Sequence, residues 1–119
     1  MKYLLLIYGE EARWGKVSDK ERDAILQEYM QFTQDIANSG HYIGGNELQP
    51  TSKATSVRIR NGKQLKSDGP FAETKEALGG YYLVEAKDLD EAIALAARIP
   101  SARWGTIEVR PIVPHDMPS

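Results

Sequence analysis

The segment Ser67–Ala86, SDGPFAETKEALGGYYLVEA, joins a constrained turn to a long apolar run. Asp68-Gly69-Pro70-Phe71 is typical of a turn, because proline restricts the residue before it and aspartate bonds to the backbone amides that follow. Leu78–Ala86 has the length and composition of a strand. The pair Gly79-Gly80 lies within that strand, where glycine normally costs stability. The segment therefore either builds a site or only turns the chain.

Upstream, the chain begins with a strand pattern and continues with a helix pattern. Lys2–Tyr8 is a continuous apolar run, as expected of a strand in the interior of a sheet. Residues 9–17 are predicted to form a loop. Ser18 and Glu21 make a capping box, and Gly40 is a typical helix end. Four apolar residues at helical spacing predict the buried face of this helix: Ile25, Tyr29, Phe32 and Ile36.

The middle of the chain predicts a strand and then a hairpin. Tyr42–Leu48 is the strand, and residues 50–54 form a linker. Thr55–Arg60 alternates as a half-buried strand does, and Asn61-Gly62 is the strongest short hairpin signal. Lys63–Ser67 is predicted to return as the second arm of this hairpin.

Downstream of the opening segment, a second capping box at Asp88 and Glu91 predicts another helix, which Pro100 ends. The last strand is predicted at Thr106–Ile112, where Pro111 indicates the strand's end or a sheet edge. Residues 113–119 are expected to form a loose tail. The predicted apolar face of the second helix consists of Leu89, Ala92, Ile93, Ala96 and Ile99.

Without the hairpin, the order of elements is strand, helix, strand, strand, helix, strand. This order predicts an α+β fold, a ferredoxin-like βαββαβ arrangement with an inserted β-hairpin, in one domain over residues 1–119. Both helices would lie on one face of the antiparallel sheet and leave the other face bare. Because the chain has no spare element to cover that face, we expect a homodimer that closes two sheets into a dimeric α/β barrel.

Composition excludes several classes of protein. The chain has 119 residues, a net charge of -2 and no cysteine, so disulfides, thiol nucleophiles and zinc–thiolate sites are absent. Lys and Arg are scattered, so nucleic acid is not an expected partner. The first apolar run is too short to span a bilayer, so we expect no membrane partner and a cytoplasmic location. No phosphate loop, Rossmann fingerprint or ligand-spaced histidines occur, so we expect no cofactor and no metal.

The motifs taken together resemble a known family. MKYLLLIYG at the start, GGNELQP in the middle, the segment from SDGPFAETKE to AARIP and the closing IEVRPI are similar to the DGPF proteins of the YCII-related group. The similarity covers residues 2–112, and DGPFAETKE followed by a glycine pair is its most specific part.

The resemblance implies a bacterial cytoplasmic protein that forms a dimeric α+β barrel. Proteins that share this barrel include muconolactone isomerases and a chlorohydroquinone dehydrochlorinase, and DGPF proteins are often encoded beside extracytoplasmic-function sigma factors. Relatives thought to be enzymes pair a histidine after the first strand with an aspartate. Here the corresponding loop, GEEARWG, has no histidine, so only Asp68 matches, as half of that pair.

Asp68 is the candidate acid or base, and its alternative role is that of a turn residue. The neighbouring candidates either contact a ligand or form a solvated turn: Gly69, Pro70, Phe71, Glu73 and Lys75. The glycine pairs, Gly44-Gly45 and Gly79-Gly80, leave room for a ligand or for a partner's backbone. Glu47 is a candidate second carboxylate or a surface residue, and Tyr8 either bonds a ligand or packs.

Two functions from different classes follow. The first is a small-molecule enzyme of the lyase or isomerase kind, acting on a ring-type or acidic metabolite. Asp68 would move a proton, and Lys75 or an arginine would stabilise the developing enolate or carboxylate. The alternative is a non-catalytic metabolite-binding protein, an accessory to a stress regulator of the sigma-factor type. The missing histidine favours the non-catalytic binding protein over the enzyme. The third possibility is a plain dimeric scaffold with a vestigial pocket.

Overall fold

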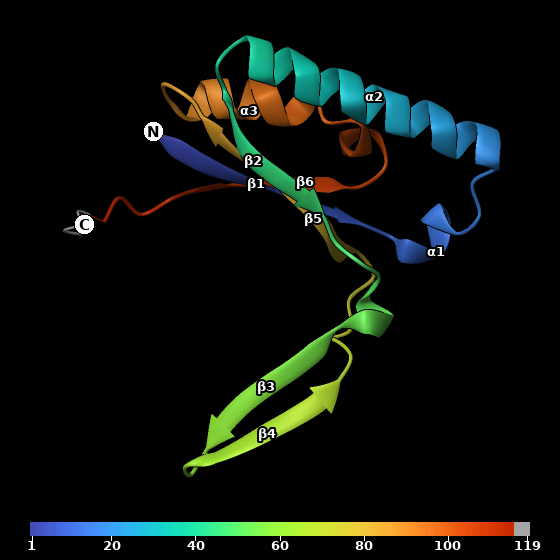
Figure 1. The fold of residues 1–119 in the computed structure, drawn as a ribbon, viewed down its shortest axis with the longest axis vertical. Helices are drawn as coiled ribbons and strands as arrows, with labels where there is room; N and C mark the ends of the chain where they lie inside the picture. Colours follow the sequence, from blue (N-terminus) through green and yellow to red (C-terminus); the bar gives the residue numbers. More distant parts are fainter. Residues whose placement is uncertain (116–119) are drawn as a thin grey trace.

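The computed structural model describes residues 1–115 and combines two sheets with helices. A four-stranded sheet carries helices, and a separate two-stranded hairpin extends from it (Figure 1). The predicted α+β class is confirmed. In chain order the elements are β1 (Lys2–Gly9), α1 (Glu11–Trp14), α2 (Asp19–Asn38), β2 (Tyr42–Glu47), η1 (Thr51–Lys53), β3 (Thr55–Arg60), β4 (Lys63–Asp68), β5 (Ala77–Glu85), α3 (Leu89–Ala97), η2 (Pro100–Arg103) and β6 (Thr106–Pro111).

The large sheet has the strand order β2-β5-β1-β6, and every neighbouring pair is antiparallel. The two central strands, β1 and β5, are the two most continuous apolar runs in the sequence, as expected of strands with neighbours on both sides. Strand β6 is an edge strand, and Pro111 is its last residue. This agrees with the prediction that Pro111 marks an end or an edge.

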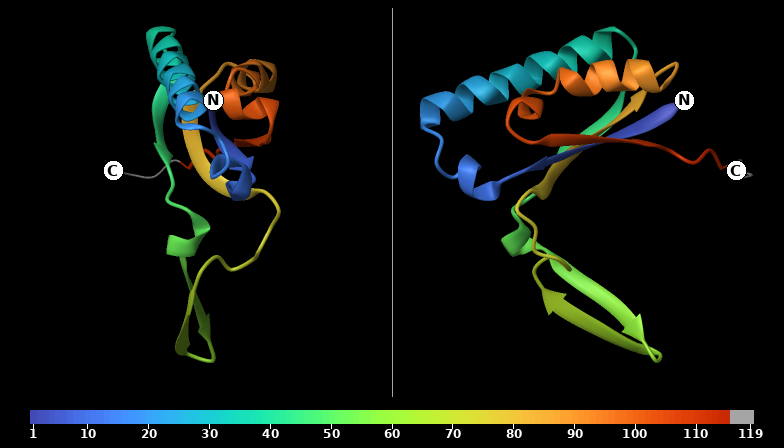
Figure 2. Two further views of the ribbon diagram at one scale, coloured as in Figure 1. Left: turned by 90° about the vertical axis from the view of Figure 1, so that its right-hand side faces the viewer. Right: turned by 180° about the vertical axis from the view of Figure 1, so that it is seen from behind.

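The core lies between the sheet and the helices α2 and α3, which cover the same face (Figures 1 and 2). Leu5 and Val84 contribute from the sheet, and Ile36 and Ile99 contribute from the helical layer; these four are the largest fully buried side chains. Burial of each such side chain stabilises the fold by about 1.5–3 kcal/mol. This layer holds the body of the protein together.

Both predicted helix starts are confirmed by their hydrogen bonds. The backbone N–H of Glu21 donates to the Ser18 hydroxyl at 3.1 Å, and that of Glu91 donates to the Asp88 carboxylate at 2.9 Å. Gly40 follows the end of α2 with a φ of 82°, the left-handed conformation expected there.

The prediction of a loop over residues 9–17 is wrong in part, because Glu11–Trp14 forms the one-turn helix α1. The N–H of Arg13 donates to the Glu10 carbonyl at 3.1 Å, and the N–H of Gly15 donates to the Glu11 carbonyl at 3.2 Å. A single turn is too short to produce a hydrophobic period, so periodicity could not indicate it.

The buried face of α3 also differs from the prediction. Leu89 and Ile93 are 48% and 49% exposed, whereas Leu95 is buried. The residues that face the core are spaced three, four and seven apart, as on one helix face: Ala92, Leu95, Ala96 and Ile99. The small alanines allow α3 to lie close to the sheet, and the larger Leu89 and Ile93 point outward.

Strands β3 and β4 form the predicted hairpin, which we call the arm (residues 55–68). Asn61 and Gly62 have φ values of 51° and 75°, as a two-residue hairpin turn of type I′ requires. The arm projects away from the body (Figures 1 and 2). Its apolar side chains remain uncovered: Val57 is 57% exposed and Ile59 is 59% exposed.

The face of the large sheet opposite the helices carries apolar side chains as well. Leu4 alternates with the core residues Tyr3 and Leu5, and it pairs with Leu83 on β5. Tyr81 lies two residues before Leu83 on the same face. All three of these outward side chains are only half-buried, and the helices drawn in Figure 2 lie on the other face. The expected bare face is therefore present.

Candidate functional site

A cavity of about 1010 Å³ lies beneath the N-terminal half of α2. Its walls come from α1, α2, η2, the end of β1, the end of β2 and the beginning of β5. Seven aromatic residues take part in the lining: Tyr8, Trp14, Tyr29, Tyr42, Tyr81, Tyr82 and Trp104. Such a concave, largely aromatic site is typical of small-molecule binding.

The cavity exists because α2 is longer than the layer it packs against. Its 20 residues span about 30 Å. In its second half, Phe32 and Ile36 are buried in the core. Closer to the N-terminus of α2, Ile25 and Tyr29 lie on the same apolar face but are only half-buried, and both line the cavity. The amphipathic face thus continues past the packed core and forms a roof.

The glycine pairs have two distinct roles. A Cβ on Gly45 would lie 2.8 Å from the Tyr81 carbonyl oxygen and 3.0 Å from the Tyr82 ring. A Cβ on Gly80 would lie 3.0 Å from the Asn46 carbonyl oxygen. These two glycines therefore let β2 and β5 approach each other. A Cβ on Gly44 would meet nothing within 4 Å, so that position needs no glycine for packing within the chain.

Two tyrosine hydroxyls in the cavity wall are fixed by partners. The Tyr29 hydroxyl shares a hydrogen bond with the Ser101 hydroxyl, and the Tyr82 hydroxyl lies 2.7 Å from the Thr33 hydroxyl. Burial raises the pKa of both tyrosines, so the two hydroxyls stay neutral over a wider pH range than in water. They present oriented rings and neutral polar groups to the cavity.

Most of the charged groups of the lining have partners within the chain. Glu28 accepts two hydrogen bonds from the Arg103 guanidinium. Glu11 accepts one hydrogen bond from the Thr51 hydroxyl at 2.6 Å and one from the Thr51 N–H at 2.8 Å, and these bonds lower the pKa of Glu11. These pairs tie α2 to η2 and α1 to η1, and so they hold the rim of the cavity.

Glu47 differs from these carboxylates. It is the last residue of β2 and lies opposite Gly80, on the helix-facing side that Gly45 and Tyr82 share. Among residues 1–115 its carboxylate forms no ion pair or hydrogen bond. Its charge contributes to the raised pKa of Tyr29, although desolvation of the phenol is the main cause.

The turn motif lies outside the cavity. Asp68 ends β4 at an exposed position, and Gly69 has a φ of 90° with its N–H donating to the Ala54 carbonyl at 2.7 Å. The hydroxyl of Ser56 donates to the Gly69 carbonyl at 2.9 Å. Phe71 is 80% exposed. These contacts are those of a tight turn, and within one chain the motif does not cover the cavity.

The predicted site residues therefore divide into two groups. One group lines the cavity: Tyr8, Gly45, Glu47, Gly79 and Gly80. The other group does not: Asp68, Gly69, Pro70, Phe71, Glu73 and Lys75. Lys75 reaches the rim by an ion pair of 3.6 Å with Glu10. Whether any member of either group binds a ligand stays a prediction.

The aromatic residues that line the cavity but are not among the predicted site residues include Trp14, Trp104 and Tyr29, of which Tyr29 is predicted as part of a buried helix face. The signal that could have indicated Tyr29 is the length of the apolar face of α2, which exceeds what a short sheet can cover. Trp14 had no such signal, because it is placed by the single turn α1.

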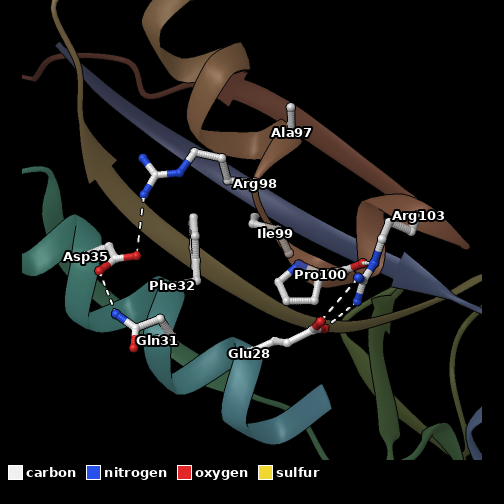
Figure 3. A pocket seen from close by; sticks show the side chains of 9 residues that line it. All are labelled: Glu28, Gln31, Phe32, Asp35, Ala97, Arg98, Ile99, Pro100 and Arg103. Atoms are coloured by element: carbon white, nitrogen blue, oxygen red, sulfur yellow. Dashed lines mark hydrogen bonds and ion pairs between the residues drawn. The ribbon is translucent and has the colours of Figure 1, made fainter. Parts of the chain in front are cut away.

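A smaller hollow of about 380 Å³ lies between α2 and the segment from α3 to η2 (Figure 3). Its floor is Phe32, Ile99 and Pro100, and two ion pairs cross it. Arg98 lies 3.9 Å from Asp35, and Arg103 bonds to Glu28. Because the chain's own charges bridge this hollow, its contacts serve helix packing.

Neither a metal site nor a membrane span is found in the described part of the chain. No group of three or more His, Cys, Asp or Glu residues among residues 1–115 could hold a metal ion. None of the helices in this range is long and apolar enough to cross a membrane.

The comparisons with known proteins agree with the motifs. The family model of the YCII-related domain matches residues 1–116. An uncharacterized protein of Rhizobium meliloti (strain 1021), R00369, is 33% identical over 124 aligned positions that cover 100% of both chains. The chain belongs to the YCII-related family.

Proposed function

We propose that the chain is a homodimeric small-molecule-binding protein whose ligand occupies the cavity beneath α2. Binding is common to the enzymatic and the non-catalytic alternatives. The observation that carries the proposal is the cavity itself, which combines volume, aromatic walls and a few oriented polar groups.

The homodimer is supported by two uncovered surfaces. The strand order and the placement of α2 and α3 on one face suit a ferredoxin-like half of a dimeric barrel. The apolar face that the second copy would cover carries Leu4, Tyr81 and Leu83. The arm is a two-stranded hairpin, which is marginal on its own in water. A second copy of the chain would cover both surfaces.

Catalysis by Asp68 is the second candidate function, and it sets a geometric condition. Because the chain's own Asp68 does not line the cavity, a proton transfer there requires the turn motif of the second copy. The exposed Phe71 beside it favours such a docking role, since an exposed large apolar side chain on a constrained turn is poised to contact another surface. Without that approach, the function is binding alone.

The test of the ligand site compares two matched variants. Ala24 lines the cavity on α2, whereas Gln27 lies on the same helix, is exposed and does not line it. In a thermal-shift screen of phenols, lactones, aromatic amines and aromatic acids, a ligand that stabilises the wild type should lose its effect in Ala24→Phe and keep it in Gln27→Phe.

Equal stabilisation of both variants by the same ligand would place the site elsewhere and overturn the proposal. The same ligand then separates the two candidate functions. If Asp68→Asn binds it normally but loses turnover that the wild type shows, Asp68 is catalytic. If neither protein turns the ligand over, the binding function remains.

A further inference from the structure

The lining of the cavity contains more negatively charged than positively charged side chains. Five carboxylates take part in it, from Glu10, Glu11, Glu21, Glu28 and Glu47, against the two guanidinium groups of Arg13 and Arg103. This is an excess of negative charge around an aromatic interior. All five glutamates are solvent-exposed, and a cleft lined mainly by one sign of charge raises the local concentration of ligands of the opposite sign.

Of the two guanidinium groups, that of Arg103 is paired with a carboxylate of the lining and that of Arg13 contacts only a ring. Arg103 bonds to Glu28 and lies 5.0 Å from the centre of the Trp104 ring. Arg13 lies 5.3 Å from the centre of the same ring. An anionic ligand would have to compete with Glu28 for Arg103, and the one other cation of the lining, Arg13, is outnumbered by the carboxylates.

Glu47, in contrast, has no partner among residues 1–115 and faces the helix side of the sheet, where the cavity lies. Tyr29 is close enough that the Glu47 charge affects its titration. A carboxylate and aromatic rings that line the same cavity are suited to an ammonium or amidinium group, which gains a charge-assisted hydrogen bond from the one and a ring contact from the other.

The rest of the wall favours an apolar body next to that positive group. The hydroxyls of Tyr29 and Tyr82 already have partners in Ser101 and Thr33, so their rings are the larger surface left to a ligand. The chain itself uses the same chemistry nearby, because the Arg22 guanidinium lies 5.1 Å from the centre of the Trp14 ring.

We propose that the ligand of this cavity is an organic cation with an aromatic or other apolar body, and that Glu47 binds its positive group. The inference rests on the proposed ligand site beneath α2 and names the chemical class that fills it. It reverses the expectation of an acidic metabolite, which assumed that Lys75 or an arginine would meet the ligand. Lys75 lies outside the lining and pairs with Glu10.

The test uses three probes of nearly the same shape and different charge: phenethylamine, 2-phenylethanol and 3-phenylpropionate. The two tryptophans of the chain, Trp14 and Trp104, both line the cavity, so intrinsic fluorescence reports on its occupancy directly. At neutral pH the amine should bind at least about tenfold more tightly than the alcohol or the acid, as a charge-assisted hydrogen bond predicts.

Variants of Glu47 assign that preference to the proposed group. Glu47→Gln should lose most of the advantage of the amine over the alcohol, and Glu47→Asp, which keeps the charge, should retain part of it. Glu76→Gln is the matched control, because Glu76 is a glutamate outside the lining. The melting temperature of each variant without probe shows whether it is folded.

The outcomes separate this inference from the function on which it rests. If the alcohol or the acid binds as tightly as the amine, the cavity is a ligand site but the cationic class is wrong. If the amine is preferred equally by wild type and Glu47→Gln, the role of Glu47 is wrong. If no probe binds at millimolar concentration, the cationic inference is overturned, and the matched Ala24 and Gln27 variants decide on the ligand site.

Discussion

The body and the arm of this chain are stabilised in different ways. In the body, Leu5, Ile36 and Val84 have no measurable exposure to solvent. In the arm, the apolar side chains Val57, Ile59 and Leu65 are 57%, 59% and 48% exposed, and the two strands pair with each other through a backbone ladder. Buried side chains stabilise the body, whereas the arm is held by the pairing of its two strands and by its two-residue turn.

The two regions differ in what their regularly spaced apolar residues contact. Apolar residues of the body meet one another within one chain. Those of the arm and of the bare sheet face have no partner in residues 1–115, although their spacing is as regular. We infer that the same hydrophobic patterning specifies the fold in one region and an interface in the other.

The largest expected effect separates the two regions by stability. Leu5→Ala removes a fully buried side chain from the centre of the sheet, and it should lower the free energy of unfolding by about 2–5 kcal/mol. The matched change in the arm, Leu65→Ala, removes the same atoms from a side chain that is 48% exposed. Urea denaturation of a monomeric sample should show less than about 0.5 kcal/mol for it.

A second, smaller effect tests the close approach of two strands in the body. Gly45→Ala places a Cβ 2.8 Å from the Tyr81 carbonyl oxygen, and it should cost about 1–3 kcal/mol because backbone must move. The neighbouring change Gly44→Ala places a Cβ in open space. Equal melting temperatures for the two variants would show that β2 and β5 are not packed as described.

A local effect is expected at the tip of the arm. Replacing Asn61-Gly62 by Ala-Ala removes the residues that tolerate positive φ, at a cost of about 1 kcal/mol at each position. Hydrogen exchange of the arm amides should become faster while exchange in β1 and β5 is unchanged. Loss of protection in the body as well would mean that the arm and the body unfold together.

The smallest expected effect is the pH dependence of stability that comes from Tyr29 in the cavity wall. Because burial raises the pKa of Tyr29, the neutral phenol stabilises the folded state. That contribution is complete below the unfolded pKa, about 10, and is lost as the pH rises through the higher folded pKa. Stability should therefore fall above about pH 10, and Tyr29→Phe should make that fall less steep in alkaline denaturation.

The Tyr29→Phe variant also loses the hydrogen bond to Ser101, worth about 0.5–1.5 kcal/mol at neutral pH. The two effects are separable, since the hydrogen bond shifts the whole curve and the titration changes its alkaline slope. An unchanged slope would indicate that Tyr29 is solvated in the folded protein.

Local signals in the sequence predicted most of the fold. The helix caps at Ser18 and Asp88, the Asn61-Gly62 turn and the apolar runs of β1 and β5 each act over a few residues, and each formed as predicted. The return bonds of the two capping boxes, from Glu21 to the Ser18 N–H and from Glu91 to the Asp88 N–H, are not formed; Glu91 accepts from the Lys87 N–H. What could not be predicted depends on more distant packing. The exposed side of α3 is decided by how closely its alanines approach the sheet, and α1 is a single turn without a period.

The site was predicted less completely than the fold. Five residues were selected because they lie on strands or at strand ends that meet, and they line the cavity: Tyr8, Gly45, Glu47, Gly79 and Gly80. Trp14 and Trp104 come from short helical turns whose positions depend on the tertiary fold. The turn motif is conspicuous in sequence, yet within one chain it does not line the cavity. The motif can contribute to a cavity only if a second copy of the chain brings it there.

The most direct test of the account is the mass of the protein in solution. Sedimentation equilibrium at micromolar concentration should give twice the mass of one chain for the wild type. Val57→Ser/Ile59→Ser should shift the protein toward the monomer if the arm contacts the second copy, while the exposed control Met30→Ser on α2 should not. A monomeric wild type would contradict the central claim that the uncovered arm and sheet face form an interface.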